Sequence, residues 1–269
     1  MFYRKALIKQ ALFKTTPDKI LIVAPHPDDE SLGCAGIIKR AINNGDDVKI
    51  IIVFDGAAYG NAMVRYRETV AAMKLLGLSS SNIIFLGFPD GKGLELWNNR
   101  MTSFPGGRYK FALHERTDFN WYLLISDLKT VLYGFDPTRI YSPSEYDEHG
   151  DHQVTAKAIK NILAEAGSSL HWKMLYSYLI HWETHYHSWP ENDMSWSAAL
   201  LNSDLKSTLH EIGEPDTEVF LPTGFTYTDK LQVIKKYTSQ LGGTDLVLTK
   251  FAKTSEIFWN DCTGPEYTR

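Results

Sequence analysis

The sequence has few of the features that mark several common protein classes. Its 269 residues include only two cysteines, Cys34 and Cys262, which favours free thiols in a reducing, cytoplasmic compartment and leaves a single disulfide open. No apolar run reaches about 18 residues, and the first 14 residues lack the pattern of a secretory signal. The net charge of −4 provides no basic surface for nucleic acid or an anionic membrane. We therefore expect neither nucleic acid nor a membrane among the partners.

Motifs of other hydrolase classes are also missing. There is no G-x-S-x-G sequence and no phosphate-binding loop, so a serine hydrolase or a nucleotidase has no support. The segment 181–187 reads HWETHYH and has some likeness to a zinc-protease helix. That motif needs glutamate directly after the first histidine, where Trp182 stands here. We interpret this segment as the rim of a cleft with aromatic packing.

Strand-like and helix-like segments alternate over the first two thirds of the chain. This alternation predicts an α/β fold, a three-layer Rossmann-like arrangement with a mostly parallel sheet and helices on both faces. In such sheets, ligands bind beyond the carboxyl ends of the strands. The expected strands are 19–24, 48–54, 82–86, 139–142 and 173–180, and the expected helices are 31–44, 62–77, 118–133 and 151–165.

The remaining segments follow no clear period. Residues 87–117 are too many for a plain connection, so we expect a functional loop region over the sheet. After residue 181 only an extended piece at 218–221 and a helix at about 228–241 are recognisable. We expect one domain over 1–269, with a core at about 17–180 and an irregular C-terminal extension at 181–269 packed on it. Selectivity for the substrate is expected to reside in 87–117 and 181–225.

Residues 25–30 carry the strongest functional signal. They read PHPDDE and directly follow the first expected strand. Clustered carboxylates repel one another unless a cation or shared protons offset their charge. One aspartate would suffice to cap the following helix. Histidine and aspartate together at a strand end therefore indicate a divalent metal, with zinc as the first choice.

A second charged motif follows the fourth expected strand. Residues 148–152 read EHGDH and open a helix, and His149 and His152 lie three apart, on nearly the same face of one turn. Both motifs stand at strand–helix junctions and should meet at the same edge of the sheet. Two histidines and a carboxylate with an open coordination position describe a catalytic zinc site.

Together the two motifs resemble the PIG-L/LmbE-like deacetylases, zinc enzymes that remove N-acetyl groups from glucosamine-containing substrates. The resemblance extends over most of the first 165 residues. Further similar sequences are SLGCAG at 31–36, RYRE at 65–68, GFPDG at 87–91, YTSQ at 237–240 and SEIF at 255–258.

The resemblance implies a role for each residue of the two motifs. His26, Asp29 and His152 become the zinc ligands, Asp28 the general base, and His149 the cation near the developing oxyanion. The charges agree with this division, because Zn²⁺ with one carboxylate and two neutral imidazoles keeps one positive charge, which suits the activation of water.

Four further residues have a structural and a functional interpretation. Glu30 and Asp151 are expected to hold the ligands or the helix N-termini. The resemblance places Arg65 in the substrate pocket, whereas a salt bridge would be the structural role. Asp90 stands in a Pro-Asp-Gly turn, so it either shapes that turn or binds sugar hydroxyls.

The sequence thus predicts a zinc-dependent hydrolase that removes acetyl from an N-acetylated amino sugar of the N-acetylglucosamine type or its conjugate. One alternative is an amidase on a non-sugar N-acyl substrate. Another is a sugar-binding protein with a vestigial metal site. Other divalent first-row metals fit such ligands as well. The sequence leaves the exact substrate and a homo-oligomer open.

Overall fold

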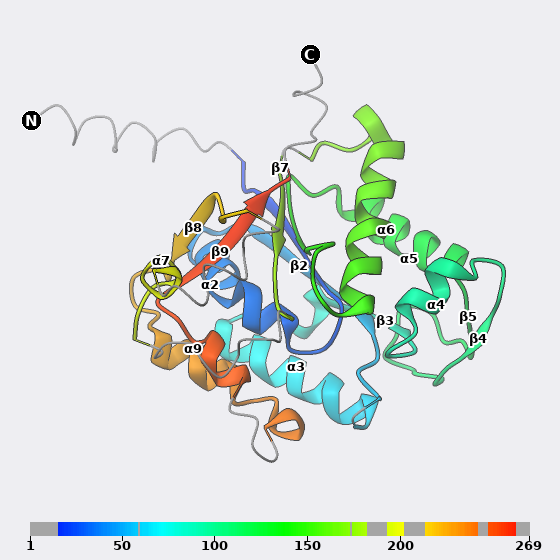
Figure 1. Cartoon of the computed structure of the whole chain (residues 1–269), viewed down its shortest axis with the longest axis horizontal. Helices are drawn as coiled ribbons and strands as arrows, with labels where there is room; N and C mark the ends of the chain where they lie inside the picture. Colours follow the sequence, from blue (N-terminus) through cyan, green and yellow to red (C-terminus); the bar gives the residue numbers. More distant parts are fainter. Residues whose placement is uncertain are drawn as a thin grey trace, which may run out of the picture.

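The computed structural model describes residues 16–58, 60–172, 174–181, 193–201, 213–241 and 247–261. Its centre is a seven-stranded sheet in the order β3-β2-β1-β6-β7-β9-β8 (Figure 1). The first five strands of this order are parallel, and β9 pairs antiparallel with both β7 and β8. The expected α/β, Rossmann-like fold with a mostly parallel sheet is confirmed. The strands are β1 (Lys19–Ala24), β2 (Asp47–Phe54), β3 (Ile83–Phe88), β6 (Arg139–Pro143), β7 (Met174–Tyr178), β8 (Thr217–Phe220) and β9 (Ser255–Asn260).

Helices cover both faces of the sheet and create two separate apolar cores. Along β1, the side chains of Ile20, Ile22 and Ala24 join one core, whereas Leu21 and Val23 join the other, as the two-residue period of a strand requires. The first core includes α2 (Asp29–Asn44), α3 (Ala62–Leu76) and α9 (Tyr227–Ile234); the second includes α5 (Trp121–Phe135) and α6 (Gly150–Ala166).

Several helix ends follow from the sequence, but the ends of α5 do not. Gly45 and Gly77 close α2 and α3 in the left-handed conformation, with φ of 74° and 96°. The predicted helix 118–133 is wrong at both ends: Asn120 caps α5 through its side chain, and α5 continues to Phe135 and ends at Asp136, which is in the left-handed conformation (φ 51°). The Asp136 carboxylate accepts the backbone N–H of His171, which offsets the cost of this conformation.

The segment 87–117 is partly regular, contrary to the expected loop region. It contains α4 (Gly93–Asn98) and β4 (Phe104–Pro105), and β4 pairs with β5 (Asp118–Phe119). Residues 118–119 therefore belong to a short strand, which explains why the next helix begins later than predicted. α4 packs on α6, so this segment lies beside one of the two charged motifs.

The C-terminal extension contributes to the sheet and covers α2. β9 was not predicted, and the predicted helix 228–241 is too long, since α9 ends at Ile234 and a short 3₁₀ turn, η4 (Thr238–Gln240), follows. The carboxylate of Glu68 on α3 accepts hydrogen bonds from the Thr238 hydroxyl and from the N–H and hydroxyl of Ser239, and so fixes this turn. Other elements of the extension are α7 (Trp196–Leu200) and η5 (Leu248–Phe251).

The described residues bear on two further predictions, the free thiols and the absence of a membrane span. Cys34 is buried in α2 with a free thiol, and Cys262 lies outside the described residues, so the thiol state of the pair stays a prediction. Among the described residues, no helix combines the length and apolar character needed to cross a bilayer.

Candidate metal centre and active site

The two charged motifs meet at the carboxyl edge of the sheet, because β1 and β6 are neighbours there. The Nδ1 atom of His26 lies 3.3 Å from Nε2 of His152. The Oδ2 atom of Asp29 lies 3.6 Å from the first nitrogen and 3.1 Å from the second. Tetrahedral ligands at zinc bond lengths are about 3.3–3.4 Å apart. These three atoms thus have the mutual spacing that a single zinc ion needs.

Other ligand groups surround this trio. Within the described parts of the chain, three sets of side chains place their ligand atoms within 4.8 Å of one another. The centre is therefore a cluster of four histidines and several carboxylates, and His26 or His152 takes part in every set. The sets are His26, His149 and His152; Asp29, His152 and His181; and His26, Asp90 and Asp151.

Carboxylates stand behind the two histidines of the trio. Nε2 of His26 lies 3.0 Å from both Asp90 Oδ1 and Asp151 Oδ2. Nδ1 of His152 lies 3.1 Å from Asp147 Oδ2. A carboxylate on the outer nitrogen orients a ligand imidazole and increases its basicity. Each histidine therefore turns its remaining nitrogen toward Asp29.

Burial and charge act against each other at these groups. Burial raises the pKa of Asp29. The charges of His152 and His26 and their hydrogen bonds to Asp29 lower it by more, so this pKa stays well below its usual range. Burial lowers the pKa of His152, yet Asp147 and Asp29 raise it to about 9. The pocket thus stabilises positive charge between its carboxylates, which is the electrostatic environment a cation requires.

Asp28 is held in an unusual backbone conformation. Its φ is 130°, and its N–H donates to Glu30 Oε2 at 3.1 Å. Arg65 fixes the carboxylate, with Nη2 3.0 Å from Asp28 Oδ2, and also donates to the carbonyl of Pro27. Burial raises the pKa of Asp28 to about 6, although Arg65 opposes the shift. A non-glycine residue at such φ costs about 1–3 kcal/mol and persists only where its surroundings hold it.

His149 caps α6 and faces the cavity. Its Nδ1 accepts the N–H of Asp151 at 3.2 Å, which leaves the proton of the neutral ring on Nε2. The ring centroid lies 4.8 Å from that of His26 in an edge-on arrangement. Burial lowers the pKa of His149, which favours a neutral ring that donates a hydrogen bond over the cation that the resemblance implied.

The two predicted substrate-binding residues both line the cavity, and both also have structural partners. Arg65 is 3% exposed and forms the salt bridge to Asp28 that was its alternative role. Its Nε and Nη1 have no hydrogen-bond partner within the described residues. Asp90 Oδ2 accepts the N–H of Ala58 at 3.1 Å, while Oδ1 faces His26. For each residue, the two interpretations are compatible.

Glu30 and Asp151 lie where support for the site was expected. Asp151 accepts the N–H groups of Gly91 and Gly93, at 2.8 and 2.7 Å, and so ties the β3–α4 turn to α6. Glu30 is fully buried and accepts the hydroxyl of Tyr237 from the C-terminal extension. Burial raises the pKa of Glu30 to about 7.

Sequence reasoning missed Asp147, and it placed His181 at the rim of a cleft but not among the ligand groups. Asp147 is fully buried, and its Oδ2 accepts the N–H groups of Ile180 and His181 at 2.9 and 3.0 Å. The only sequence signal was an acidic residue two positions before His149. His181 lines the cavity, with its ring centroid 4.7 Å from that of His152. The rest of the segment 181–187 lies outside the described residues.

Asp55 is a third residue that the sequence did not single out. It follows β2, and its Oδ1 accepts the N–H groups of Ala57 and Asp90 at 3.0 and 3.2 Å. Its Oδ2 accepts the hydroxyl of Tyr109 at 2.7 Å. Asp55 therefore fixes the turn that directs Asp90 toward His26.

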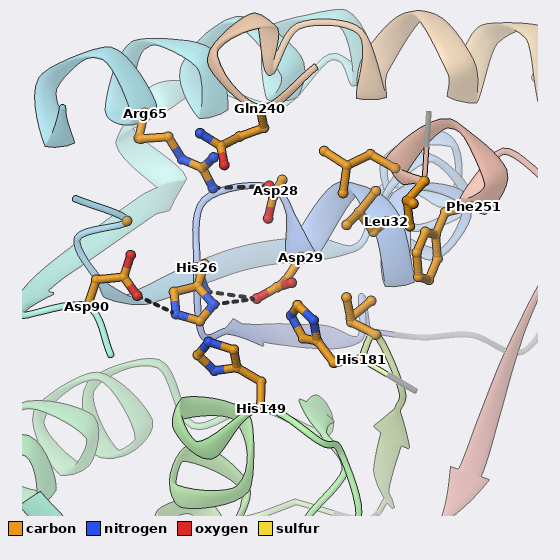
Figure 2. Close-up of a pocket in the computed structure, with 14 residues that line it drawn as sticks. His26, Asp28, Asp29, Leu32, Arg65, Asp90, His149, His181, Gln240 and Phe251 are labelled. Carbon is orange, nitrogen blue, oxygen red and sulfur yellow. Dashed lines mark hydrogen bonds and ion pairs between the residues drawn. The ribbon is translucent and has the colours of Figure 1, made fainter. Parts of the chain in front are cut away.

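A cavity of about 520 Å³ opens beside the cluster. Figure 2 shows the histidines and aspartates between Arg65 and Asp90 on one side and Leu32 and Phe251 on the other. The volume lies within the usual range for small-molecule sites, about 300–1,000 Å³. Its walls are His26, Asp28, Asp29, Leu32, Gly56, Arg65, Asp90, His149, Ile180, His181, Gln240, Val247, Leu248 and Phe251.

A known family model matches the part of the chain that carries both motifs. Residues 21–163 match the model described as PIG-L: GlcNAc-PI de-N-acetylase. The match covers more than half of the chain, from β1 to the last turns of α6. A comparison with curated proteins found no match.

Solved structures with low sequence identity have the same fold. The conserved protein TT1542 from Thermus thermophilus is 20% identical, with a TM-score of 0.59, and the match covers 91% of this chain and 94% of that one. N,N'-diacetylchitobiose deacetylase from Pyrococcus horikoshii is 18% identical, with a TM-score of 0.57, and the match covers 96% of this chain and 91% of that one. GalB, a 4-carboxy-2-hydroxymuconate hydratase from Pseudomonas putida, is 13% identical, with a TM-score of 0.56, and the match covers 91% of this chain and 96% of that one. Since GalB is named as a hydratase and the Pyrococcus protein as a deacetylase, the shared fold alone does not determine the reaction.

Proposed function

Because the chain belongs to the PIG-L family, we propose that it is a zinc-dependent hydrolase that removes the acetyl group from an N-acetylated amino sugar or its conjugate. The observation that carries the proposal is the convergence of His26 Nδ1, Asp29 Oδ2 and His152 Nε2 within 3.1–3.6 Å of one another. A purely structural ion pair would need only two of these groups. Three converging ligands, each buried, are typical of a metal site.

The donor set fits zinc in chemistry as well as in spacing. Imidazole nitrogen and carboxylate oxygen are ordinary zinc ligands, and three protein ligands leave a coordination position for water or substrate. Zinc held there supplies a Lewis acid that polarises a carbonyl and lowers the pKa of water to about 7. His26, Asp29 and His152 are the residues that would hold it.

Asp28 is suited to take the proton of the attacking water. It lines the cavity directly beside the ligand Asp29, and Arg65 keeps its carboxylate from turning toward the ligands. General bases of this kind contribute about 10²–10⁴-fold to a rate. Its burial, with a raised pKa, makes the carboxylate more basic than a solvated aspartate.

His149 is suited to stabilise the oxyanion that develops on the amide oxygen. Its neutral ring has Nε2–H available to donate, because Nδ1 already accepts the Asp151 N–H. Removing such a donor costs about 10²–10³ in rate. The leaving amine then receives a proton from Asp28 or from His149, both of which line the cavity.

The polar side of the cavity supports an amine component rich in hydrogen-bonding groups. Arg65 offers two buried N–H-bearing nitrogens without partners in the described chain, and Asp90 offers a carboxylate. Hydroxyl groups of a sugar can accept from the first and donate to the second. We propose Arg65 and Asp90 as substrate-binding residues on this ground.

An acetate-release assay on the zinc-loaded protein tests the proposal. The substrates are N-acetylglucosamine, its conjugates and N-acetylated amino acids. This panel distinguishes a deacetylase for amino sugars from an amidase for non-sugar substrates. We expect release from the sugars, about 10²–10⁴-fold less turnover in Asp28→Asn with metal retained, and loss of both metal and turnover in His26→Ala. Asp127→Asn, a buried carboxylate bonded to Arg116, is the matched control. Near-normal turnover in Asp28→Asn would overturn the assignment of the base.

A further inference from the structure

The cavity has one strongly polar and one apolar half. The apolar half is built from residues that the two charged motifs do not contain. Leu32, Ile180 and Phe251 are 2%, 2% and 3% exposed, so they form an enclosed part of this wall, whereas Val247 and Leu248 are half-buried and lie at its more open part. Its residues are Leu32, Ile180, Val247, Leu248 and Phe251.

Three separate elements bring these side chains together next to the metal ligands. Leu32 lies one turn after Asp29 on α2, and therefore on the same face of that helix. Ile180 directly precedes His181, and Asp147 holds the backbone of both residues. The turn η5 packs on α2 and supplies the remaining wall from the C-terminal extension.

The two halves match the two components of an amide. An amide joined to an amino sugar has a polar amine component and an apolar acyl component on either side of the carbonyl carbon. Arg65 and Asp90 face the amine component under the proposed function, and they lie across Asp28 and Asp29 from Leu32 and Phe251 (Figure 2). The acyl component then extends into the apolar half.

We infer that this apolar half selects an acyl chain longer than acetyl, so that the preferred substrates are N-acyl amines with a short alkyl chain such as butanoyl or hexanoyl. The inference rests on the proposed function and concerns the same reaction. Water adds to the acyl carbon, the C–N bond breaks, and the products are the carboxylate of the fatty acid and the protonated amine. Acetyl presents only one methyl group to five apolar side chains.

The burial of methylene groups gives the expected size of the effect. Each methylene moved from water to an apolar wall contributes about a 4-fold gain in binding. Butanoyl has two more methylenes than acetyl. If both are buried in the transition state, kcat/KM for butanoyl exceeds that for acetyl by about 15-fold.

The experiment measures amine release from N-acetyl-, N-butanoyl- and N-hexanoyl-glucosamine, with the butyl glycoside of N-acetylglucosamine as a fourth substrate. We expect kcat/KM to rise about 15-fold from acetyl to butanoyl. Calorimetry with acetate and butanoate, the products, should give a similar ratio of Kd values without any turnover. Butanoate that binds no more tightly than acetate would contradict the inference.

A pair of leucine variants assigns the effect to these walls. Leu248→Asn places an amide in the apolar half and should reduce the butanoyl-to-acetyl ratio to near one. Leu231→Asn is the matched control, because Leu231 is also a half-buried leucine packed against the same core, but it does not line the cavity. The control should keep the ratio at about 15-fold. An unchanged ratio in Leu248→Asn would overturn the assignment.

The outcomes separate the inference from the proposed function. If acetyl is hydrolysed and longer chains are hydrolysed more slowly, the inference fails and the deacetylase proposal stands. If the butyl glycoside reacts faster while chain length on nitrogen has no effect, the apolar half binds the aglycone and the inference is wrong. If none of the four substrates reacts, the proposed function fails, and the inference with it.

Discussion

The buried ion pair between Lys230 and Glu256 offers a direct test of how the C-terminal extension is joined to the core. Lys230 Nζ lies 2.7 Å from Glu256 Oε1, and the side chains are 0% and 1% exposed. Glu256 also accepts the N–H groups of Gly36 and Ile37, at 2.7 and 3.0 Å, in the middle of α2. The pair thus connects α9 and β9 to the helix that begins with Asp29.

The variant Lys230→Met removes the positive charge but keeps an apolar stem of similar length. It leaves a buried carboxylate with only backbone donors, which costs about 3–5 kcal/mol. For a chain of this size the melting temperature should fall by about 5–10 °C. In Lys230→Met/Glu256→Gln no charge is left unpaired, so the double variant should recover more than half of the loss.

Urea unfolding followed by circular dichroism and by tryptophan fluorescence measures these changes. Lys92→Met is the matched control, because its partner Glu95 lies at a similar distance, 2.6 Å, but the two side chains are 42% and 47% exposed. An exposed pair of this kind contributes about 0–1 kcal/mol. We also expect the two probes to give one shared transition, as for a single domain over 1–269. A cost below 1 kcal/mol for Lys230→Met, or two separate transitions, would refute this reasoning.

Three further predictions concern the site. Asp147→Asn should weaken zinc binding by about 10–100-fold, because the outer nitrogen of the ligand His152 loses its carboxylate. Competition with a chelating dye measures this affinity, and the control Asp127→Asn should leave it unchanged. Equal affinities in the two variants would contradict the role of Asp147. Arg65→Lys should lower kcat/KM about 10²-fold without loss of metal, since an ammonium cannot reach both Pro27 and Asp28 as the guanidinium does, and full activity would contradict this. Dialysis against a chelator should abolish acetate release and added zinc should restore it; activity that survives metal removal would exclude the proposed chemistry.

The sequence predicted the sheet well where the signal was local. β1 and β2 contain the continuous apolar runs 20–24 and 50–54, and Gly45 and Gly77 mark the ends of the first two helices. The prediction failed where tertiary contacts decide. Asp136 closes α5 only because His171, distant in sequence, binds its carboxylate. No sequence window contains that contact.

The C-terminal extension shows the same limit. β9 contains Glu256, a charged residue at its second position, which argues against a buried strand when sequence alone is considered. The structure compensates this charge with Lys230 and with the backbone of α2. The predicted helix beyond Ile234 fails for a related reason, because Glu68 on α3 binds the turn at 238–240.

At the site, sequence spacing located the residues on the motifs and missed those on other segments. His26, Asp28, Asp29 and His152 stand in short motifs after strands, and their convergence follows from the parallel order of those strands. His181 begins the segment 181–187, whose likeness to a zinc-protease helix gave no role for it, and the neighbouring positions of β6 and β7 in the sheet bring it beside His152. The sequence did not predict the apolar wall either, because the wall combines residues from three segments that are distant in the sequence.

Diffraction at the zinc absorption edge, on crystals grown with zinc, gives the position of the bound ion. The proposed metal centre predicts one anomalous peak among His26 Nδ1, Asp29 Oδ2 and His152 Nε2, and no peak there in crystals of Asp29→Ala. Bound zinc whose peak lies away from these three atoms, or a peak at this position that persists in Asp29→Ala, would contradict it.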